Sequence, residues 1–302
     1  MQSTGELGYD TATVISQGRR ERQEDAVISD FPTGSGMGFV VLADGMGGHS
    51  AGDVASKIVV TEVFSELKLQ TGDIEAMERN IGDILRGAAF GANECVGLYS
   101  AEKSDDHLMG ATLLAPVLIG DRLFWISVGD SPLYLMRDGA LTRLNDDHAV
   151  GSQVEYLVAS GLMRRDEAVN HPEPNSLTSV LVGQDIPQID CPAEPFRLAA
   201  GDILIAASDG LLVLSDEQIA RTLRPLRDSS AEAIGAALMG AIEAADDPHQ
   251  DNVTLGIVKV QDRAVPGRAS IGDALQPKVL RRDLGGVTIV AKVSNRAASA
   301  AG

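Results

Sequence analysis

The chain of 302 residues has only two cysteines, Cys95 and Cys191, and no histidine or cysteine cluster with the spacing of a zinc site. Two thiols so far apart in sequence indicate reduced cysteines in the cytoplasm rather than a disulfide framework. The chain also lacks an apolar run long enough to span a bilayer. Residues 1–6 show no basic stretch leading into an apolar one, so we expect neither a membrane anchor nor a secretory signal.

Basic residues are scarce as well, because 25 Lys and Arg stand against 43 Asp and Glu, for a net charge of −18. Nucleic-acid binding requires a basic face, so this balance argues against nucleic acid as a partner. Residues 261–302 differ, with seven basic against three acidic residues, a net charge of +4 that leaves −22 on residues 1–260. The shift predicts a boundary near residue 260, between a globular body and a basic tail.

What the chain does contain is an apolar run that ends in a carboxylate and then in glycines. Residues 37–43 are rich in apolar and β-branched types and predict a buried strand that stops at Asp44. Three glycines follow, which would let the main chain approach a bound ion or phosphate: Gly45, Gly47 and Gly48. Residues 50–53 then have the pattern of a capping box and predict a helix start. Asp-Gly is also a common turn dipeptide, so the pair alone is equally consistent with a plain turn.

A second charged stretch, residues 19–25, lies between strands expected at residues 11–16 and 26–28. Such a stretch is ordinarily a solvated hairpin loop. This one places Arg20, a side chain that can hold a phosphate bidentately, close in sequence to the carboxylates of Glu24 and Asp25, which suit a hard cation. Both parts of a phosphate and metal site are therefore present.

Further aspartates stand at the ends of other expected strands. Asp130 lies between strands at 123–128 and 133–137, Asp209 follows a strand at 202–207, and Asp251 precedes a closing strand at 253–260. Carboxylates gathered in an interior repel one another and resist desolvation, so they are tolerated chiefly when cations neutralise them. Oxygen-only ligation indicates Mg²⁺ or Mn²⁺, and two such ions about 3.5–4 Å apart can activate a shared water for displacement at phosphorus. Asp138-Gly139, by contrast, is predicted to be an ordinary hairpin turn.

Five ordered motifs resemble those of the metal-dependent protein serine/threonine phosphatases, the protein phosphatase 2C family, in its bacterial form. They are Gly18-x-Arg20-x-x-x-Glu24-Asp25, Asp44-Gly45-Met46-Gly47-Gly48, Gly129-Asp130-Ser131, Ser208-Asp209-Gly210 and Asp251-Asn252. The resemblance covers residues 8–260 and implies an α+β fold, a four-layer α-β-β-α sandwich of two antiparallel sheets flanked by helices. It implies hydrolysis of phosphoserine and phosphothreonine on proteins, in opposition to a serine/threonine kinase in bacterial signalling.

The resemblance also implies roles at a dinuclear site at one end of the sandwich. Asp44 would bridge two Mn²⁺ or Mg²⁺ ions, and the carbonyl of Gly45 would bind the second ion. Asp209 and Asp251 would complete the coordination of one ion.

The remaining motif residues would act around these ions. Glu24 and Asp25 would support the other ion directly or through water. Arg20 would bind the substrate phosphate, and Asp130 together with Asp209 matches the weaker third metal of bacterial members.

The sequence departs from the family pattern at positions that are not ligands in it. Ala111 stands where members usually have Thr, and Pro132 where they commonly have Arg. Eukaryotic relatives have a His, proposed as a general acid, where this chain has Met46. His49, three residues later, is interpreted as structural or solvent-exposed.

Three other functions remain open from the sequence. One is a catalytically inactive regulator that binds phosphoproteins, which a missing metal aspartate would favour; none is missing. Another is a metal-stabilised scaffold that acts through its tail. The third is a specialised phosphatase for one small signalling protein.

Periodicity predicts the remaining elements. Two long helices follow residue 50, and the second covers residues 74–95. Residues 146–176 predict a flap with helices at 153–160 and 164–169. Other strands are expected at 111–119, 141–144, 177–181 and 196–198, and helices at 215–222 and 231–245. The tail, residues 261–302, is expected to be partly disordered or a short hairpin around Gly285-Gly286 that needs a surface to lie on.

Overall fold

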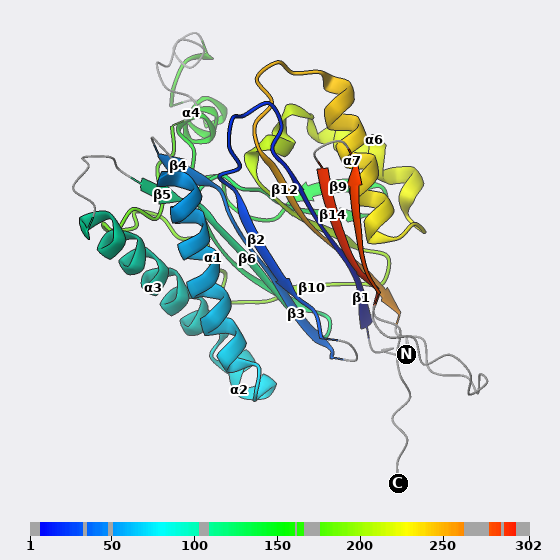
Figure 1. Cartoon of the computed structure of the whole chain (residues 1–302), viewed down its shortest axis with the longest axis horizontal. Helices are drawn as coiled ribbons and strands as arrows, with labels where there is room; N and C mark the ends of the chain where they lie inside the picture. The colour runs from blue at the N-terminus through cyan, green and yellow to red at the C-terminus, as the bar shows by residue number, and fades with distance from the viewer. Residues whose placement is uncertain are drawn as a thin grey trace.

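Two antiparallel sheets pack face to face, and helices cover the outer face of each sheet (Figure 1). The computed structural model describes residues 7–32, 35–47, 51–102, 109–160, 162–165, 176–262, 278–284 and 287–293. The predicted four-layer α-β-β-α sandwich is confirmed.

The larger sheet has seven strands and the smaller sheet has five. In spatial order the larger sheet is β13 (Lys278–Leu284), β14 (Val287–Val293), β1 (Leu7–Ser16), β12 (Val253–Asp262), β11 (Ile203–Ala207), β8 (Leu133–Arg137) and β9 (Ala140–Arg143). The smaller sheet is β10 (Phe196–Arg197), β7 (Arg122–Val128), β6 (Leu113–Ile119), β3 (Met37–Ala43) and β2 (Ala26–Asp30). A separate pair joins β4 (Gly45–Gly47) to β5 (Met109–Ala111).

Successive residues of the central strands enter different apolar layers because side chains alternate across a strand. In β3, Val40 packs between the sheets while Val41 packs under the helices of the smaller sheet. In β11, Leu204 lies between the sheets and Ile205 faces the helices of the larger sheet. Both faces of these strands are buried, so their sequences are continuous apolar runs rather than alternating ones.

The helices divide between the two outer faces. The smaller sheet is covered by α1 (Ala51–Gln70), α2 (Ile74–Arg79) and α3 (Ile81–Glu102). The larger sheet is covered by α6 (Asp216–Leu223) and α7 (Ala231–Ala245), with the 3₁₀ turns η1 (Asp209–Val213) and η2 (Arg224–Leu226). The predicted cap of α6 is confirmed, because the Ser215 hydroxyl accepts from the Gln218 N–H and the Gln218 side chain accepts from the Ser215 N–H.

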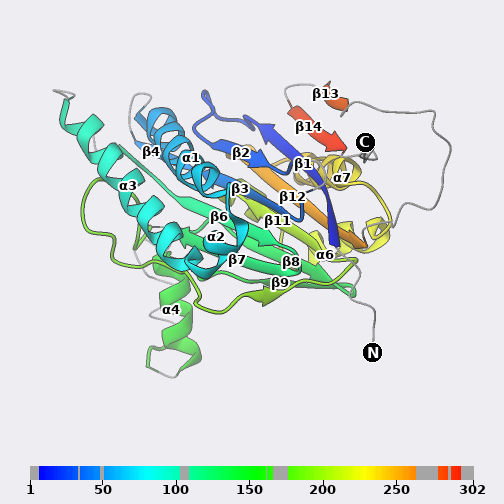
Figure 2. The same ribbon diagram turned by 90° about the horizontal axis from the view of Figure 1, so that it is seen from below.

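Strand β1 joins segments from opposite ends of the chain. Its Leu7 lies opposite Asp262 of β12, and its Thr11 lies opposite Lys292 of β14 on the other side. The hairpin of β13 and β14 therefore continues the larger sheet beyond β1, beside α7 (Figure 2). The division of the chain at residue 260 into a body and a tail stays a prediction.

The structure corrects three predicted elements. The helix predicted over 74–95 breaks at Asn80, whose N–H donates to the Met77 carbonyl and ends α2. The strand predicted over 111–119 is split at Thr112 into β5 and β6, which belong to different sheets. Residues 177–181 form no continuous strand; Leu177 and Leu181 make only isolated bridges, to Ala149 and Ala111.

The predicted flap contains one helix in the described residues, α4 (Val150–Ala159), which projects from the body of the sandwich (Figures 1 and 2). The second predicted flap helix, residues 164–169, lies largely outside the described residues. No helix in the described part of the chain is both long enough and apolar enough to cross a membrane.

Candidate active site

Two aspartates of the candidate site lie on neighbouring strands of the smaller sheet. Asp44 directly follows β3, and Asp25 directly precedes β2. The two strands are antiparallel, with Ala26 opposite Ala43, so the end of β3 and the start of β2 coincide. Strand pairing alone brings the two carboxyl groups together.

Three more aspartates reach the same end of the sandwich from other strands. Asp209 follows β11, Asp251 lies just before β12, and Asp130 follows β7. Each of these three carboxylates contributes to the electrostatic repulsion acting on Asp44. The structure therefore brings together all five aspartates predicted from the sequence.

The cluster raises the pKa values of its members. Burial, followed by repulsion from Asp25 and Asp209, raises the pKa of Asp44 well above its usual range. Burial is also the largest cause at Asp25, Asp130 and Asp209, and it raises each of their pKa values to about 6. Without a bound cation, the cluster therefore holds protons at a pH, such as about 5, at which isolated aspartates would have released them.

Two buried carboxylate oxygens of the cluster, Oδ1 of Asp25 and Oδ1 of Asp209, have no hydrogen-bond partner among the described residues. The other oxygen of Asp25 is satisfied, because Oδ2 accepts from Ser208 Oγ at 2.8 Å. Ser208 Oγ in turn accepts from the Thr254 N–H at 2.9 Å. A buried oxygen left without a partner is destabilising, and an oxygen-only set of such atoms fits a hard divalent cation.

The carboxylates nevertheless do not stand in a finished coordination geometry. No group of three or more His, Cys, Asp or Glu side chains in the described ranges is arranged to hold a metal ion. Burial raises the pKa of Asp25 and of Asp209, and hydrogen bonding to Asp44 partly offsets that rise. The donor set, carboxylate oxygens gathered at one end of the sandwich, fits Mn²⁺ or Mg²⁺.

Gly45 brings Glu24 close to the cluster. A Cβ on Gly45 would lie 2.1 Å from the Gly52 carbonyl oxygen and 2.6 Å from the Glu24 carbonyl oxygen. The Gly45 N–H donates to that Glu24 oxygen at 3.2 Å. Burial raises the pKa of the Glu24 side chain, although Arg20 and Arg22 act against the rise. Main-chain packing that only glycine permits therefore places Glu24 beside Asp44.

Arg20 lies at the rim of the site. Its side chain is 58% exposed, and its guanidinium donates to Asp251 Oδ2 at 2.5 Å. Arg20 therefore contacts one of the predicted metal ligands and remains open to solvent on its other side. A guanidinium in this position can reach an incoming phosphate without leaving the carboxylate cluster.

Asn252 fixes the loop that carries Arg20. Its side-chain oxygen accepts from the Glu24 N–H at 2.8 Å, and its side-chain nitrogen donates to the carbonyls of Gln17 and Arg22, each at 2.9 Å. The loop at residues 17–24 therefore supplies a hydrogen-bond partner for the oxygen and for both N–H groups of the buried Asn252 amide.

Hydroxyl groups support Asp44 and Asp130. The Asp44 N–H donates to Thr112 Oγ1 at 2.9 Å, and the Thr112 N–H donates to the Asp44 carbonyl at 2.9 Å. The Thr112 hydroxyl also lies 2.9 Å from Ser131 Oγ, in a fully buried pair. The break between β5 and β6 thus places Thr112 where it links two of the sequence motifs.

Arg143 of β9 connects the Asp130 loop to the flap. Its guanidinium donates to the Asp130 carbonyl at 2.7 Å and to Asp147 Oδ2 at 3.0 Å. Asp147 Oδ2 also accepts from Ser152 Oγ of α4 at 2.6 Å. A guanidinium therefore reaches the Asp130 loop from β9.

The sequence analysis missed four residues that hold the carboxylates in place, which are Thr112, Arg143, Asp147 and Thr254. Ser131, Ser208 and Asn252 belonged to the sequence motifs, but no role was assigned to them. The one available signal was the position of Thr112 and Ser131 beside strand ends. Residues 48–50, which include His49 and Ser50, the first residue of the predicted capping box, lie outside the described residues.

Sequence comparisons agree with this geometry. The family model of protein phosphatase 2C matches residues 17–239. A putative protein phosphatase 2C-type of Streptococcus pyogenes is 33% identical over 256 residues, which cover 82% of this chain and 94% of that protein. The serine/threonine protein phosphatase PstP of Mycobacterium tuberculosis is 32% identical over 250 residues, which cover 80% of this chain and 43% of PstP.

Solved structures agree as well. The crystal structure of the Mycobacterium tuberculosis phosphatase PstP/Ppp matches with a TM-score of 0.68 and 28% identity, over 85% of this chain and 99% of that one. The catalytic domain of PstP in complex with two manganese ions matches with a TM-score of 0.64 and 29% identity, over the same shares of the two chains.

Fold, carboxylate cluster and relatives together define the class, a metal-dependent protein phosphatase and thus a hydrolase. The chain belongs to the protein phosphatase 2C family. It is a serine/threonine protein phosphatase of that type, and its substrates are phosphoproteins.

Proposed function

We propose that this chain hydrolyses phosphoserine and phosphothreonine on proteins at a two-metal site, in opposition to a serine/threonine kinase in bacterial signalling. The observation that carries the proposal is the convergence of five aspartates, two of them with buried oxygens that lack a hydrogen-bond partner. The separation of the two cysteines supports a cytoplasmic location.

Asp44 would hold both Mn²⁺ or Mg²⁺ ions, because it lies at the end of β3 among the four other aspartates of the cluster. Asp209 and Asp251 would complete the coordination of one of these ions. The Gly45 carbonyl would contact the second, with Glu24 and Asp25 supporting it directly or through water. What the ions supply when bound is a water of lowered pKa that can attack phosphorus in line.

The protein's own groups position the substrate. Arg20 is proposed to bind the phosphate dianion, since its guanidinium lies at the rim beside Asp251. Attack by water forms one P–O bond and breaks the bond to the Ser or Thr oxygen, which leaves as a hydroxyl beside inorganic phosphate. Asp130, next to Asp209, is proposed to hold a weaker third ion.

Metal dependence tests the proposal directly. The full chain should hydrolyse phosphoserine and phosphothreonine peptides with Mn²⁺ or Mg²⁺, release inorganic phosphate stoichiometrically, and stop when a chelator is added. A phosphotyrosine peptide and p-nitrophenyl phosphate, assayed in parallel, separate residue preference from general phosphatase chemistry. Turnover that survives exhaustive chelation would contradict the two-metal site.

A further inference from the structure

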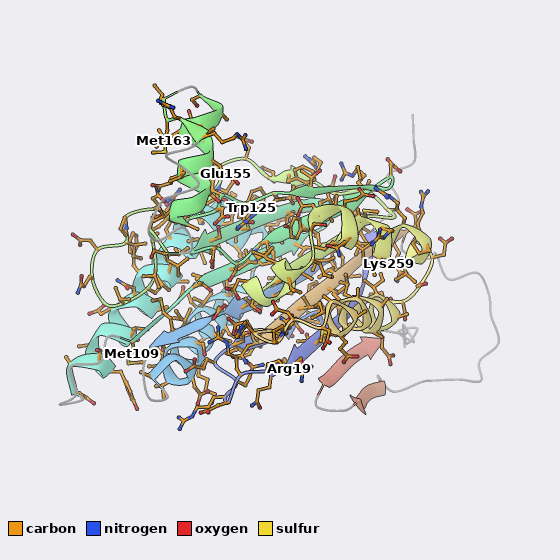
Figure 3. All side chains as sticks on the ribbon, turned by 90° about the horizontal axis from the view of Figure 1, so that it is seen from above. Arg19, Met109, Trp125, Glu155, Met163 and Lys259 are labelled. Carbon is orange, nitrogen blue, oxygen red and sulfur yellow. The ribbon has the colours of Figure 1, made fainter. Side chains whose placement is uncertain are left out.

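A groove runs between the flap helix α4 and residues 187–189, with a volume of about 790 Å³. Tyr156 and Leu157 line it from α4, and Pro187 and Ile189 line it from the opposite side. Asp146 and Asp147 stand at one end. Figure 3 shows α4, labelled at Glu155, standing out from the body of the sandwich, with Met163 beyond its end.

The acidic end of the groove adjoins the carboxylate cluster. Asp147 shares the guanidinium of Arg143 with the Asp130 carbonyl, at 3.0 Å and 2.7 Å. Asp147 is therefore separated from the Asp130 loop by a single side chain. The groove therefore lies close to the cluster, where a residue next to a phosphorylated side chain could reach it.

One wall of the groove is firmly anchored. The Asp146 N–H donates to Asp190 Oδ2 at 3.0 Å, and the same oxygen accepts from Trp125 Nε1 of β7 at 2.9 Å. The Ser179 hydroxyl donates to the Gln188 carbonyl at 2.6 Å. These bonds fix the backbone on which Asp146 and the 187–189 segment are carried, so the groove is preformed on this side.

The groove combines aromatic and aliphatic surface with negative charge. Tyr156 is 69% exposed, which is unusual for so large a side chain in a protein with few aromatic residues. Asp146 is exposed at the acidic end. A lysine or arginine side chain matches both features, because its aliphatic stem packs on the apolar wall and its charge can meet a carboxylate or the face of an aromatic ring.

We propose that this groove binds the segment of a phosphoprotein next to the phosphorylated residue and favours a basic side chain there. The inference rests on the proposed phosphatase function and adds a substrate preference to it. The net charge of −22 on residues 1–260 draws basic segments toward the same body.

The test compares two phosphothreonine peptides of equal length, one with arginines and one with glutamates around the phosphothreonine, using the full chain with saturating Mn²⁺. We expect a KM about tenfold lower for the arginine peptide, the size of one contact worth about 1.4 kcal/mol. Asp146→Lys should abolish most of this difference, and Tyr156→Ala should raise KM for the arginine peptide about fivefold. The kcat/KM for p-nitrophenyl phosphate should stay unchanged in both variants.

Glu155→Lys is the matched control, because it makes the same charge change on α4 at an exposed residue that does not line the groove. It should leave the peptide preference intact. Equal KM values for the two peptides, or an equal effect of Glu155→Lys and Asp146→Lys, would overturn the inference. Loss of p-nitrophenyl phosphate turnover in Asp146→Lys would also overturn it, because Asp146 would then act in the metal site. Failure of the phosphatase function itself would show differently, as no metal-dependent turnover of either peptide.

Discussion

The same dipeptide, Asp-Gly, serves two purposes in this molecule. In the turn between β8 and β9, Asp138 and Gly139 both have left-handed backbones, with φ of 50° and 84°, and a Cβ on Gly139 would meet nothing within 4 Å. In the two site copies the glycines do not have positive φ, yet there is no room for a side chain. A Cβ would lie 2.1 Å from the Gly52 carbonyl at Gly45 and 1.9 Å from the Asn252 carbonyl at Gly210.

The difference teaches what each glycine is for. The turn needs glycine for its backbone angle, as two-residue hairpins do. The site needs glycine because two main chains approach closely, and that approach brings the carboxylates of different strands together. The aspartates differ accordingly, since Asp138 is exposed while Asp44 and Asp209 are partly buried with raised pKa values.

Replacing each of the three aspartates by asparagine tests this comparison most strongly. Asp44→Asn and Asp209→Asn should each lower kcat for a phosphothreonine peptide by at least ~10³, because each removes an anionic metal ligand. Asp138→Asn, the matched control, should leave kcat unchanged. The measurement is steady-state kinetics at saturating Mn²⁺. Full activity in either site variant would disprove the dinuclear assignment.

The stability of the metal-free protein should depend on pH in a particular direction. The pKa values of Asp25, Asp130 and Asp209 are raised from 3.8 to about 6. Between pH 3.8 and about pH 6, the folded chain therefore holds protons that the unfolded chain has released. Rising pH then favours the unfolded state, and the loss is complete once pH exceeds the folded pKa values. Because one pKa unit corresponds to about 1.36 kcal/mol, each of these carboxyl groups that titrates independently should lower the free energy of unfolding by roughly 3 kcal/mol between about pH 4 and pH 7.

Urea unfolding at several pH values, with chelator and with Mn²⁺, measures this dependence. Mn²⁺ should remove most of it, because a bound cation replaces the protons. Asp138→Asn should leave the curve unchanged. A metal-free protein that becomes more stable as pH rises through this range would show that the carboxylates are not held together.

Alanine at Gly210 and at Gly139 separates the effect of close main-chain packing from the effect of the backbone angle. Gly210→Ala would force the ends of β11 and β12 apart and should lower kcat about 10²-fold, the loss typical of a displacement near 1 Å in a reacting geometry. Gly139→Ala should cost about 1–2 kcal/mol of stability, because its φ is left-handed, and should leave kcat unchanged. Equal kinetic effects of the two substitutions would mean that the close approach at Gly210 does not position Asp209.

Arg20→Ala asks whether phosphate binding can be separated from the carboxylate cluster. We expect KM for a phosphothreonine peptide and Ki for inorganic phosphate to rise about tenfold, since a charge-assisted contact is lost. Mn²⁺ affinity measured by calorimetry should be unchanged. If calorimetry shows lost metal affinity instead, the contact between Arg20 and Asp251 is part of the metal site.

Removal of residues 263–302 should have the smallest effect. Every proposed site residue precedes Val260, so the shortened chain keeps all of them. Mn²⁺-dependent kcat should stay within about threefold, because all five sequence motifs and strand β12 are retained. Loss of β14 exposes the edge of β1, so light scattering should show greater self-association. A truncated chain that does not fold would make the hairpin an integral part of the sandwich.

Some elements could be predicted to the residue. The bounds of β3, β8 and α7 match the predictions, because each is an uninterrupted apolar or periodic run with a clear stop on both sides. The runs at 111–119 and 177–181 were not assigned correctly. Apolar content indicates that a segment is buried. It does not show where the segment changes from one neighbouring strand to another, or where strand pairing stops.

The site divides in the same way. Its carboxylates could be found because each stands directly after or before an apolar strand, a local signal. Thr112 and Arg143 could not, because a single hydroxyl or guanidinium carries no periodic pattern and its partners lie far away in sequence. Arg20 could be predicted because it lies close in sequence to the carboxylates of Glu24 and Asp25. Its contact with Asp251, 231 positions away, could not, because that contact depends on how β1 and β12 pair.

Asn252 has a consequence for how the protein is made. Its side chain holds the loop at residues 17–24 across 228 positions of sequence, and it does so from the start of β12, the last strand of the body. A ribosome releases the loop long before it releases Asn252, and contacts of such long range form late. We therefore expect the growing chain to remain unable to dephosphorylate anything until its body is essentially complete, so that no partly synthesised fragment acts as an unregulated phosphatase.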